Sequence, residues 1–264
     1  MYIDIKYSLK FVPGGSVMNA MLDCKFYRHL LSGILMGLLV IPYAANAQTM
    51  DQVEVTCPLG GEVFQATLAM SGTAFGTYLD FRPYGPIASP PPLPKCPSNG
   101  FVVYKRKFND DELQRIKPYV VSQDYQALQR THTNYYLAAK LQTHLGASQK
   151  QLACTLLYAS WETERPDQYR EYATEALEAY KRALTEEYPK KNEWLTDQLV
   201  AGELERRLGR FAEANSRFLF IADREKTSSG TLHDMLELQL QLLKAKDSEP
   251  NLAPQPNVGN RPPR

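Results

Sequence analysis

The chain has 264 residues, 44% of them hydrophobic and 22% charged, with a formal net charge of +1. This length suits one domain, or one domain joined to a small module. The near-neutral charge argues against a nucleic-acid-binding protein, because contacts to phosphate groups select for a strong excess of Lys and Arg.

Residues 1–47 have the pattern of a secretory signal. Lys25 and Arg28 precede an apolar run over residues 30–41, and Ala45-Asn46-Ala47 follows it. This order of segments is typical of a cleaved leader. The run is shorter than the roughly 20 residues that a helix needs to cross a bilayer. We therefore expect cleavage after Ala47, export to the periplasm or the medium, and no stable membrane span thereafter; an uncleaved membrane anchor is the alternative.

Residues 48–108 are predicted to form a small β segment around two cysteine turns. Alternating polar and apolar residues indicate three strands, over residues 53–56, 62–68 and 101–104. The two turns have the sequences Cys57-Pro58-Leu59-Gly60-Gly61 and Cys96-Pro97-Ser98-Asn99-Gly100. A zinc ribbon has Cys-x-x-Cys in each such turn, because four soft ligands surround the ion. Gly60 and Asn99 stand where two of the four cysteines would be, so we expect a ribbon-like segment without metal or cofactor.

Export would also change the chemistry of the cysteines. Thiols that lie side by side across a ribbon pair with each other in an oxidising compartment, so we expect a disulfide between Cys57 and Cys96. The alternatives are a structural zinc ion retained at the ribbon and a mixed metal site that includes His132. Cys154 lies in an apolar run and is expected to be a buried, unreactive thiol.

Four prolines fall within residues 90–94, which should therefore adopt the polyproline II conformation. Because this segment leads directly into the second cysteine turn, we interpret it as a stiff spacer that positions Cys96. A partner protein that recognises prolines is the alternative.

Residues 109–246 are predicted to form a helical domain of about six helices. Asn109 and Glu112 have the spacing of a capping box, and Pro118 is expected to end the short first helix. Apolar periodicity and capping residues place further helix starts near Tyr135, Ser148, Pro166, Asn192, Phe211 and Leu232. Residues 247–264 are rich in proline and poor in apolar side chains, so this tail is predicted to be disordered.

The helix that begins at Pro166 carries tyrosines on one broad face, at Tyr169, Tyr172 and Tyr180. Tyrosine is common on surfaces that bind a partner while remaining in contact with water. These three residues are therefore our candidates for binding a protein or peptide. Core packing is the alternative, and it is the more frequent reason for such a face.

The turn over residues 204–214 resembles that of a tetratricopeptide repeat. The small and aromatic positions of that repeat are matched by Gly202, Gly209, Phe211, Ala214 and Phe218. An ordinary helical hairpin is the alternative, because a single repeat cannot form a solenoid.

A wider resemblance spans about residues 52–225. It is carried by the first cysteine turn, Leu79–Pro86, Cys96–Phe101, Tyr135–Ala139 and Leu157–Trp161. In this order the segments resemble an uncharacterised family of bacterial proteins with a zinc-ribbon-like N-terminal segment and tetratricopeptide-like helices. The resemblance implies a fold and no known reaction.

No catalytic residue is predicted, since the sequence has no Gly-x-Ser-x-Gly turn, phosphate loop or dinucleotide fingerprint. We expect a predominantly helical α+β protein, with a ribbon-like β segment packed on a tetratricopeptide-like helical domain. The favoured function is an exported, non-enzymatic protein-interaction or scaffold module with an unidentified protein or peptide partner. A structural zinc-binding protein and an enzyme of unrecognised type are the alternatives.

Overall fold

The protein is predominantly helical, with two small antiparallel sheets, in the computed structural model, which describes residues 48–185, 191–226 and 228–255. The predicted signal lies outside these residues. The strands are β1 (Thr49–Thr56), β2 (Val63–Ser71), β3 (Gly76–Thr77) and β4 (Pro83–Tyr84). The helices are α1 (Asp110–Val120), α2 (Gln123–Thr131), α3 (Asn134–Leu145), α4 (Gln149–Glu162), α5 (Pro166–Ala183), α6 (Lys191–Arg207), α7 (Phe211–Glu225) and α8 (Thr231–Lys244).

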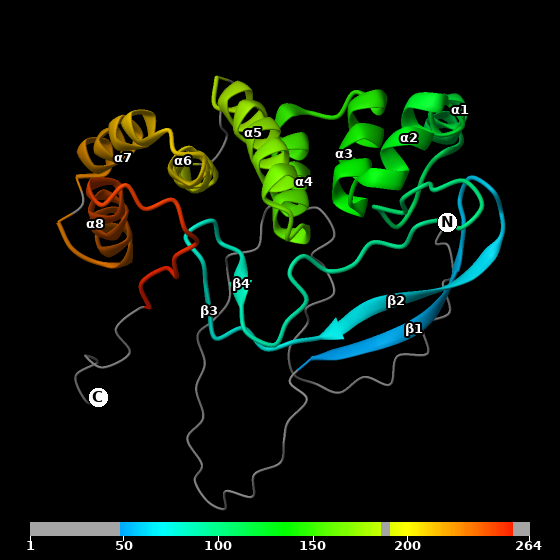
Figure 1. Cartoon of the computed structure of the whole chain (residues 1–264), viewed down its shortest axis with the longest axis horizontal. Helices are drawn as coiled ribbons and strands as arrows, with labels where there is room; N and C mark the ends of the chain where they lie inside the picture. The colour runs from blue at the N-terminus through cyan, green and yellow to red at the C-terminus, as the bar shows by residue number, and fades with distance from the viewer. Residues whose placement is uncertain (1–47, 186–190, 227, 256–264) are drawn as a thin grey trace, which may run out of the picture.

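The helices stand in a row, and the strands lie along one side of it (Figure 1). From α3 onward each helix packs against the next one in the chain. None of the helices in the described residues combines the length and the apolar character needed to cross a membrane.

The first helix begins as predicted and ends later. The Glu112 amide donates to Asn109 Oδ1 at 2.8 Å, and the Asn109 amide donates to Glu112 Oε2 at 2.9 Å, which completes the capping box. The helix continues past Pro118 to Val120, so the predicted end is wrong. Pro118 falls in the last turn, where it removes one hydrogen bond while Val120 remains fully buried in the core.

Local signals also located most of the later helix ends. Gly146 ends α3 in the left-handed conformation, with φ of 78°. Ser148 opens α4 with a second capping box, and Pro166 occupies the first turn of α5. Asn192 does not cap α6, because that helix already begins at Lys191. The described chain has eight helices, where about six were expected and seven starts were predicted; α2 is the helix without a predicted start.

A glycine sets the close approach of α6 and α7. A Cβ atom at Gly202 would lie 2.5 Å from Phe218 Cε1, so no larger residue fits there without displacing that ring. Phe218 and Ala214 of α7 are both fully buried at this crossing.

The larger sheet is the two-stranded ribbon β1–β2, in which Val53 opposes Ala66 and Val55 opposes Phe64. The smaller sheet is the hairpin β3–β4. The strand predicted over residues 101–104 is wrong, because Val102 forms only an isolated bridge with Lys95.

Two hydrophobic cores hold the molecule together. The first joins both cysteine turns to buried side chains from α1 through α6, so the ribbon segment shares its core with the helices. The second lies among α6, α7 and α8 and also contains Leu79 and Ala253. The prediction of a disordered tail is therefore wrong for residues 247–255, which the structure describes and which bury Ala253.

Candidate functional site: the linked cysteine turns

The two cysteine turns have the same main-chain geometry. In each turn the cysteine amide donates to the carbonyl five residues later, at 2.8 Å in both. The glycine four residues later donates back to the cysteine carbonyl, at 2.9 Å in both. Gly61 and Gly100 have φ of 76° and 74°, a conformation that favours glycine. The turns therefore keep a common shape although their third and fourth residues differ.

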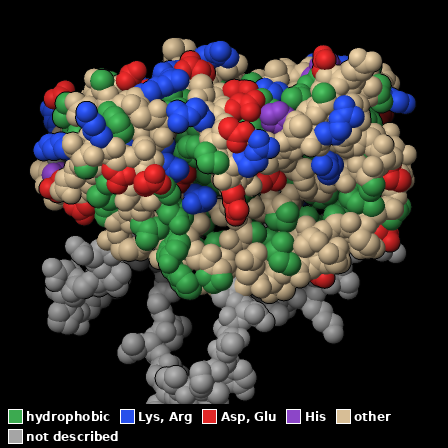
Figure 2. Space-filling view, in the orientation of Figure 1, with side chains coloured by type: hydrophobic (Ala, Val, Ile, Leu, Met, Phe, Trp, Pro, Cys, Tyr) green, Lys and Arg blue, Asp and Glu red, His purple; other side chains and the backbone are tan. Residues whose placement is uncertain are grey.

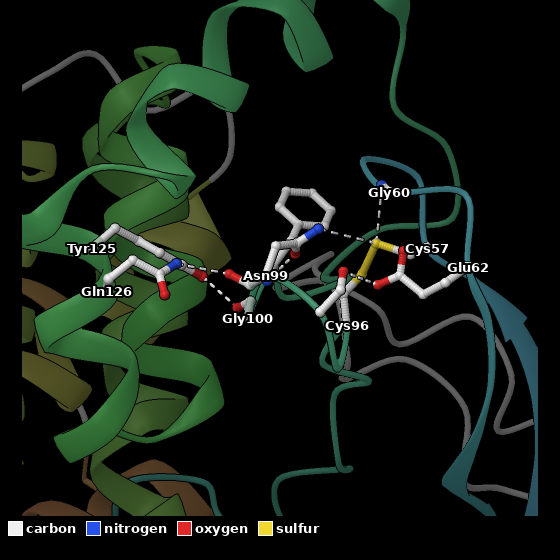
Figure 3. The surroundings of a disulfide bond; sticks show 10 residues. Cys57, Gly60, Glu62, Cys96, Asn99, Gly100, Tyr125 and Gln126 are labelled. Atoms are coloured by element: carbon white, nitrogen blue, oxygen red, sulfur yellow. Dashed lines mark hydrogen bonds between the residues drawn. A yellow bond between two sulfur atoms is a disulfide. The ribbon is translucent and has the colours of Figure 1, made fainter.

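A disulfide joins the two turns, as predicted (Figure 3). Cys57 and Cys96 are 39 residues apart, and each side chain is 1% exposed. In the described part of the chain no cysteine is free, so the prediction of a free thiol at Cys154 is wrong.

The residues that replace the two missing cysteines also face this bond. The Gly60 amide lies 3.4 Å from Cys57 Sγ, and Asn99 Nδ2 lies 3.9 Å from the same atom. A Cβ atom at Gly60 would be 3.2 Å from Asn99 Nδ2. Positions 57, 60, 96 and 99 thus converge on one point, and the two sulfur atoms there are bonded to each other.

Glu62 is the polar neighbour that the sequence did not reveal. Its carboxylate accepts a hydrogen bond of 2.5 Å from Ser98 Oγ, which holds the pKa of Glu62 below its usual value. Ligand atoms of Cys57, Cys96 and Glu62 lie within 4.8 Å of one another. No other cluster of potential metal ligands of this kind occurs in the described residues.

His132 does not join this group, so the mixed site expected as an alternative is not assembled. Its Nδ1 lies 3.0 Å from the hydroxyl of Tyr172, and its ring stacks on Tyr136 with 4.4 Å between centroids. The half-buried imidazole is part of the aromatic packing between α3 and α5.

The second turn is fixed to the helical body. Tyr125 donates its hydroxyl hydrogen to the Gly100 carbonyl at 2.9 Å, and Gln126 Nε2 donates to the Asn99 carbonyl at 2.9 Å (Figure 3). Burial raises the pKa of Tyr125, which keeps the phenol protonated as a donor. The disulfide therefore connects the end of the β1–β2 ribbon to a turn docked on α2.

The proline segment lies along α3 before it reaches Cys96. Tyr135 donates to the Pro91 carbonyl at 2.9 Å, and Asn134 Nδ2 donates to the Leu93 carbonyl at 2.8 Å. These contacts agree with a spacer that positions the cysteine.

The candidate tyrosines of α5 divide into two kinds. Tyr172 is 0% exposed and Tyr180 is 1% exposed. Buried side chains cannot contact a partner, so the core alternative holds for these two residues. Tyr169 is half-buried, and the guanidinium of Arg207 lies 4.7 Å from the centre of its ring.

A second polar contact anchors the β3–β4 hairpin. Asp80 is 6% exposed, and its carboxylate accepts from Trp161 Nε1 at 2.8 Å and from the Arg82 amide at 3.0 Å. Burial raises the pKa of Asp80. Sequence reasoning used the segments around Asp80 and Trp161 only for a family resemblance and did not pair them.

Comparison with known proteins identifies a family without assigning a reaction. Residues 96–243 match the family described as uncharacterized protein conserved in bacteria (DUF2225). The match begins at the second cysteine turn and covers all of α1 to α7. No curated protein and no solved structure matches this chain. Since the matched region is more than half of the chain, the protein belongs to the DUF2225 family of bacterial proteins.

Proposed function

We propose that this protein is an exported, non-enzymatic interaction or scaffold module whose ribbon segment is closed by a disulfide in place of a metal ion. The observation that carries the proposal is the Cys57–Cys96 bond between two turns of equal shape. Both sulfur atoms are consumed in that bond, and neither is available as a nucleophile or a thiolate ligand.

Export is supported by the leader pattern and by the disulfide together. Disulfides persist in oxidising compartments and are rare where cytosolic thiols keep cysteines reduced. A bond that closes a loop of this length stabilises a chain by about 3–4 kcal/mol. This stabilisation would be present after export, once the disulfide has formed, and absent while the cysteines are still reduced.

The interaction role is supported by the row of helices. Successive packing from α3 to α8, with Gly202 and Phe218 at a close crossing, is the kind of arrangement that tetratricopeptide-like proteins use to present an extended surface. We therefore infer that these helices are tetratricopeptide-like.

The test uses protein recovered from the periplasmic fraction of an expressing bacterium. Intact mass should correspond to a chain that begins at Gln48. Peptide mapping without reduction should find Cys57 and Cys96 linked and resistant to alkylation, and elemental analysis should find zinc far below one ion per chain. Stoichiometric zinc with both thiols alkylated would overturn the proposal.

A structural metal site is the second candidate, because three ligand atoms of Cys57, Cys96 and Glu62 lie within 4.8 Å. It would require reduced cysteines and a divalent cation that accepts sulfur and oxygen ligands. Zinc titration of the reduced protein separates the candidates. Glu62→Gln should weaken zinc binding if this candidate is right, whereas Glu54→Gln, at an exposed position of β1, is the matched control.

A further inference from the structure

Residues 247–253 form a strap that runs from the end of α8 across the end of α6. Two neighbouring arginines of α6 bind its main chain. Arg206 donates to the carbonyls of Asp247 at 2.6 Å and Glu249 at 3.0 Å. Arg207 donates to the carbonyl of Ser248 at 2.8 Å. Three successive carbonyls of the strap are therefore bound by one pair of side chains.

The far end of the strap pairs with the hairpin. Leu79 donates its amide hydrogen to the Asn251 carbonyl at 3.0 Å, and Ala253 donates to the Thr77 carbonyl at 2.8 Å. Tyr78 and Leu252 form the antiparallel bridge between these two bonds. The strap thus extends the edge of β3 in the way that an added peptide strand extends a sheet.

The arginines are held in position independently of the strap. Arg206 is 0% exposed and forms two hydrogen bonds with Glu203, at 2.7 and 3.0 Å. Gln239 of α8 donates to the same carboxylate. Arg207 lies over the ring of Tyr169. Glu203 thus orients the Arg206 guanidinium and Tyr169 orients that of Arg207, so their donors need little reordering when an extended segment binds.

The contacts favour an extended segment with acidic side chains. Main-chain atoms make the hydrogen bonds described above, so they tolerate many sequences. The Asp247 carboxylate lies 3.7 Å from Arg206, which adds attraction for a negative charge. Leu252 of the strap is 44% exposed, and Phe75 and Tyr84 are 62% and 43% exposed. Figure 2 shows hydrophobic side chains gathered along the lower edge of the molecule, the area where Figure 1 draws β3 and β4.

We propose that Arg206, Arg207 and the Thr77–Leu79 edge form a docking surface for an extended acidic segment of a partner protein, and that the strap occupies this surface as an internal ligand until the partner displaces it. The inference rests on the proposed interaction role and names its surface and the chemistry of its partner. Tyr169 contributes by positioning Arg207, which gives one of the three candidate tyrosines a place in binding.

The experiment uses the full chain and a fluorescein-labelled synthetic peptide with the sequence of residues 246–254. Ala253→Pro removes the donor to the Thr77 carbonyl and should loosen the strap. Leu252→Pro is the matched control, because in this register the amide of residue 252 faces away from β3. Hydrogen exchange reports release of the strap, fluorescence anisotropy reports peptide binding, and thermal unfolding verifies that both variants fold.

The peptide should bind Ala253→Pro about fivefold more tightly than the wild-type chain or Leu252→Pro, since one fewer bond holds the competing strap. A peptide with Lys at the positions of Asp247 and Glu249 should bind about threefold more weakly.

A strap that stays protected from hydrogen exchange in Ala253→Pro, or a released strap without peptide binding, would overturn the proposal. A concentration-dependent dimer of Ala253→Pro in sedimentation would also overturn it, because the occupant would then be a second copy of this chain. None of these outcomes bears on the disulfide and zinc measurements above.

Discussion

Tyrosine side chains connect the elements of the core through their hydroxyl groups. Tyr125 binds a carbonyl of the second cysteine turn, and Tyr135 binds one in the proline segment. Tyr172 contacts His132, and the hydroxyl of Tyr180 lies 3.8 Å from Cys154 Sγ. A buried tyrosine can thus fill apolar volume and also form a hydrogen bond at a distance from its helix, which a leucine cannot do.

Removing one of these rings should be costly. Tyr172→Ala is expected to lower the free energy of unfolding by about 3–5 kcal/mol, because it leaves a large cavity among α3 and α5 side chains and removes the partner of His132. Tyr84→Ala, at a 43% exposed position, should change it by less than about 1 kcal/mol. Urea unfolding of both variants measures the difference. Equal effects would contradict the assignment of Tyr172 to the core.

At the scale of the secondary-structure elements, a side-chain hydrogen bond to α4 adds to the core packing of Leu79 in holding the β3–β4 hairpin. The hairpin is short, and its turn contains Phe81 with φ of 65°, a conformation that non-glycine residues adopt at a cost. The bond between Trp161 and Asp80 fixes this turn to the end of α4. The hairpin in turn pairs with the strap, so the Trp161–Asp80 hydrogen bond helps to hold both the hairpin and residues 247–253 in place.

Trp161→Phe should therefore loosen the hairpin. It keeps an aromatic ring but leaves one carboxylate oxygen of Asp80 without its donor, which should cost about 1–3 kcal/mol of stability. Trp194→Phe is the natural control, because Trp194 packs against Phe220 and Arg224 through its ring. Hydrogen exchange should rise in residues 76–84 of the Trp161 variant only. A similar pattern in both variants would show that the hydrogen bond does not fix the hairpin.

Local chemistry explains which elements could be predicted. The Asn109 capping box, Gly146 and Pro166 act on their own helix ends, so periodicity and capping rules located α1, α3 and α5. The cysteine pair was also accessible, since each turn has its own signature. The strap was not, because its order comes from Arg206 and from the distant hairpin rather than from its own composition. Glu62 was missed for the same reason, as Ser98 approaches it only after the two turns meet.

At the scale of the whole molecule, the Cys57–Cys96 disulfide ties a largely exposed ribbon to the helical body. Most residues of β1 are exposed, and a two-stranded ribbon alone is marginally stable in water. The Cys57–Cys96 bond fixes its closed end to the turn held by α2. The helices, by contrast, pack against one another without it.

Removing the Cys57–Cys96 disulfide should raise the mobility of the β1–β2 ribbon and leave that of the helices unchanged. In the Cys57→Ser/Cys96→Ser variant, hydrogen exchange should rise over residues 49–71, while α3, α4 and α5 remain protected. A uniform rise across helices and ribbon would instead mean that the bond stabilises the entire fold, and an unchanged ribbon would mean that packing alone holds it.

The strap also has a consequence for biosynthesis. A ribosome makes the β3–β4 hairpin early, α6 later, and residues 247–253 after both of them. Until the strap emerges, a nascent chain has an open edge at Thr77–Leu79 and an Arg206 whose main-chain acceptors do not yet exist. Residues 247–253 therefore cover this surface last in the order of synthesis, and a chain cut short before them would leave it uncovered.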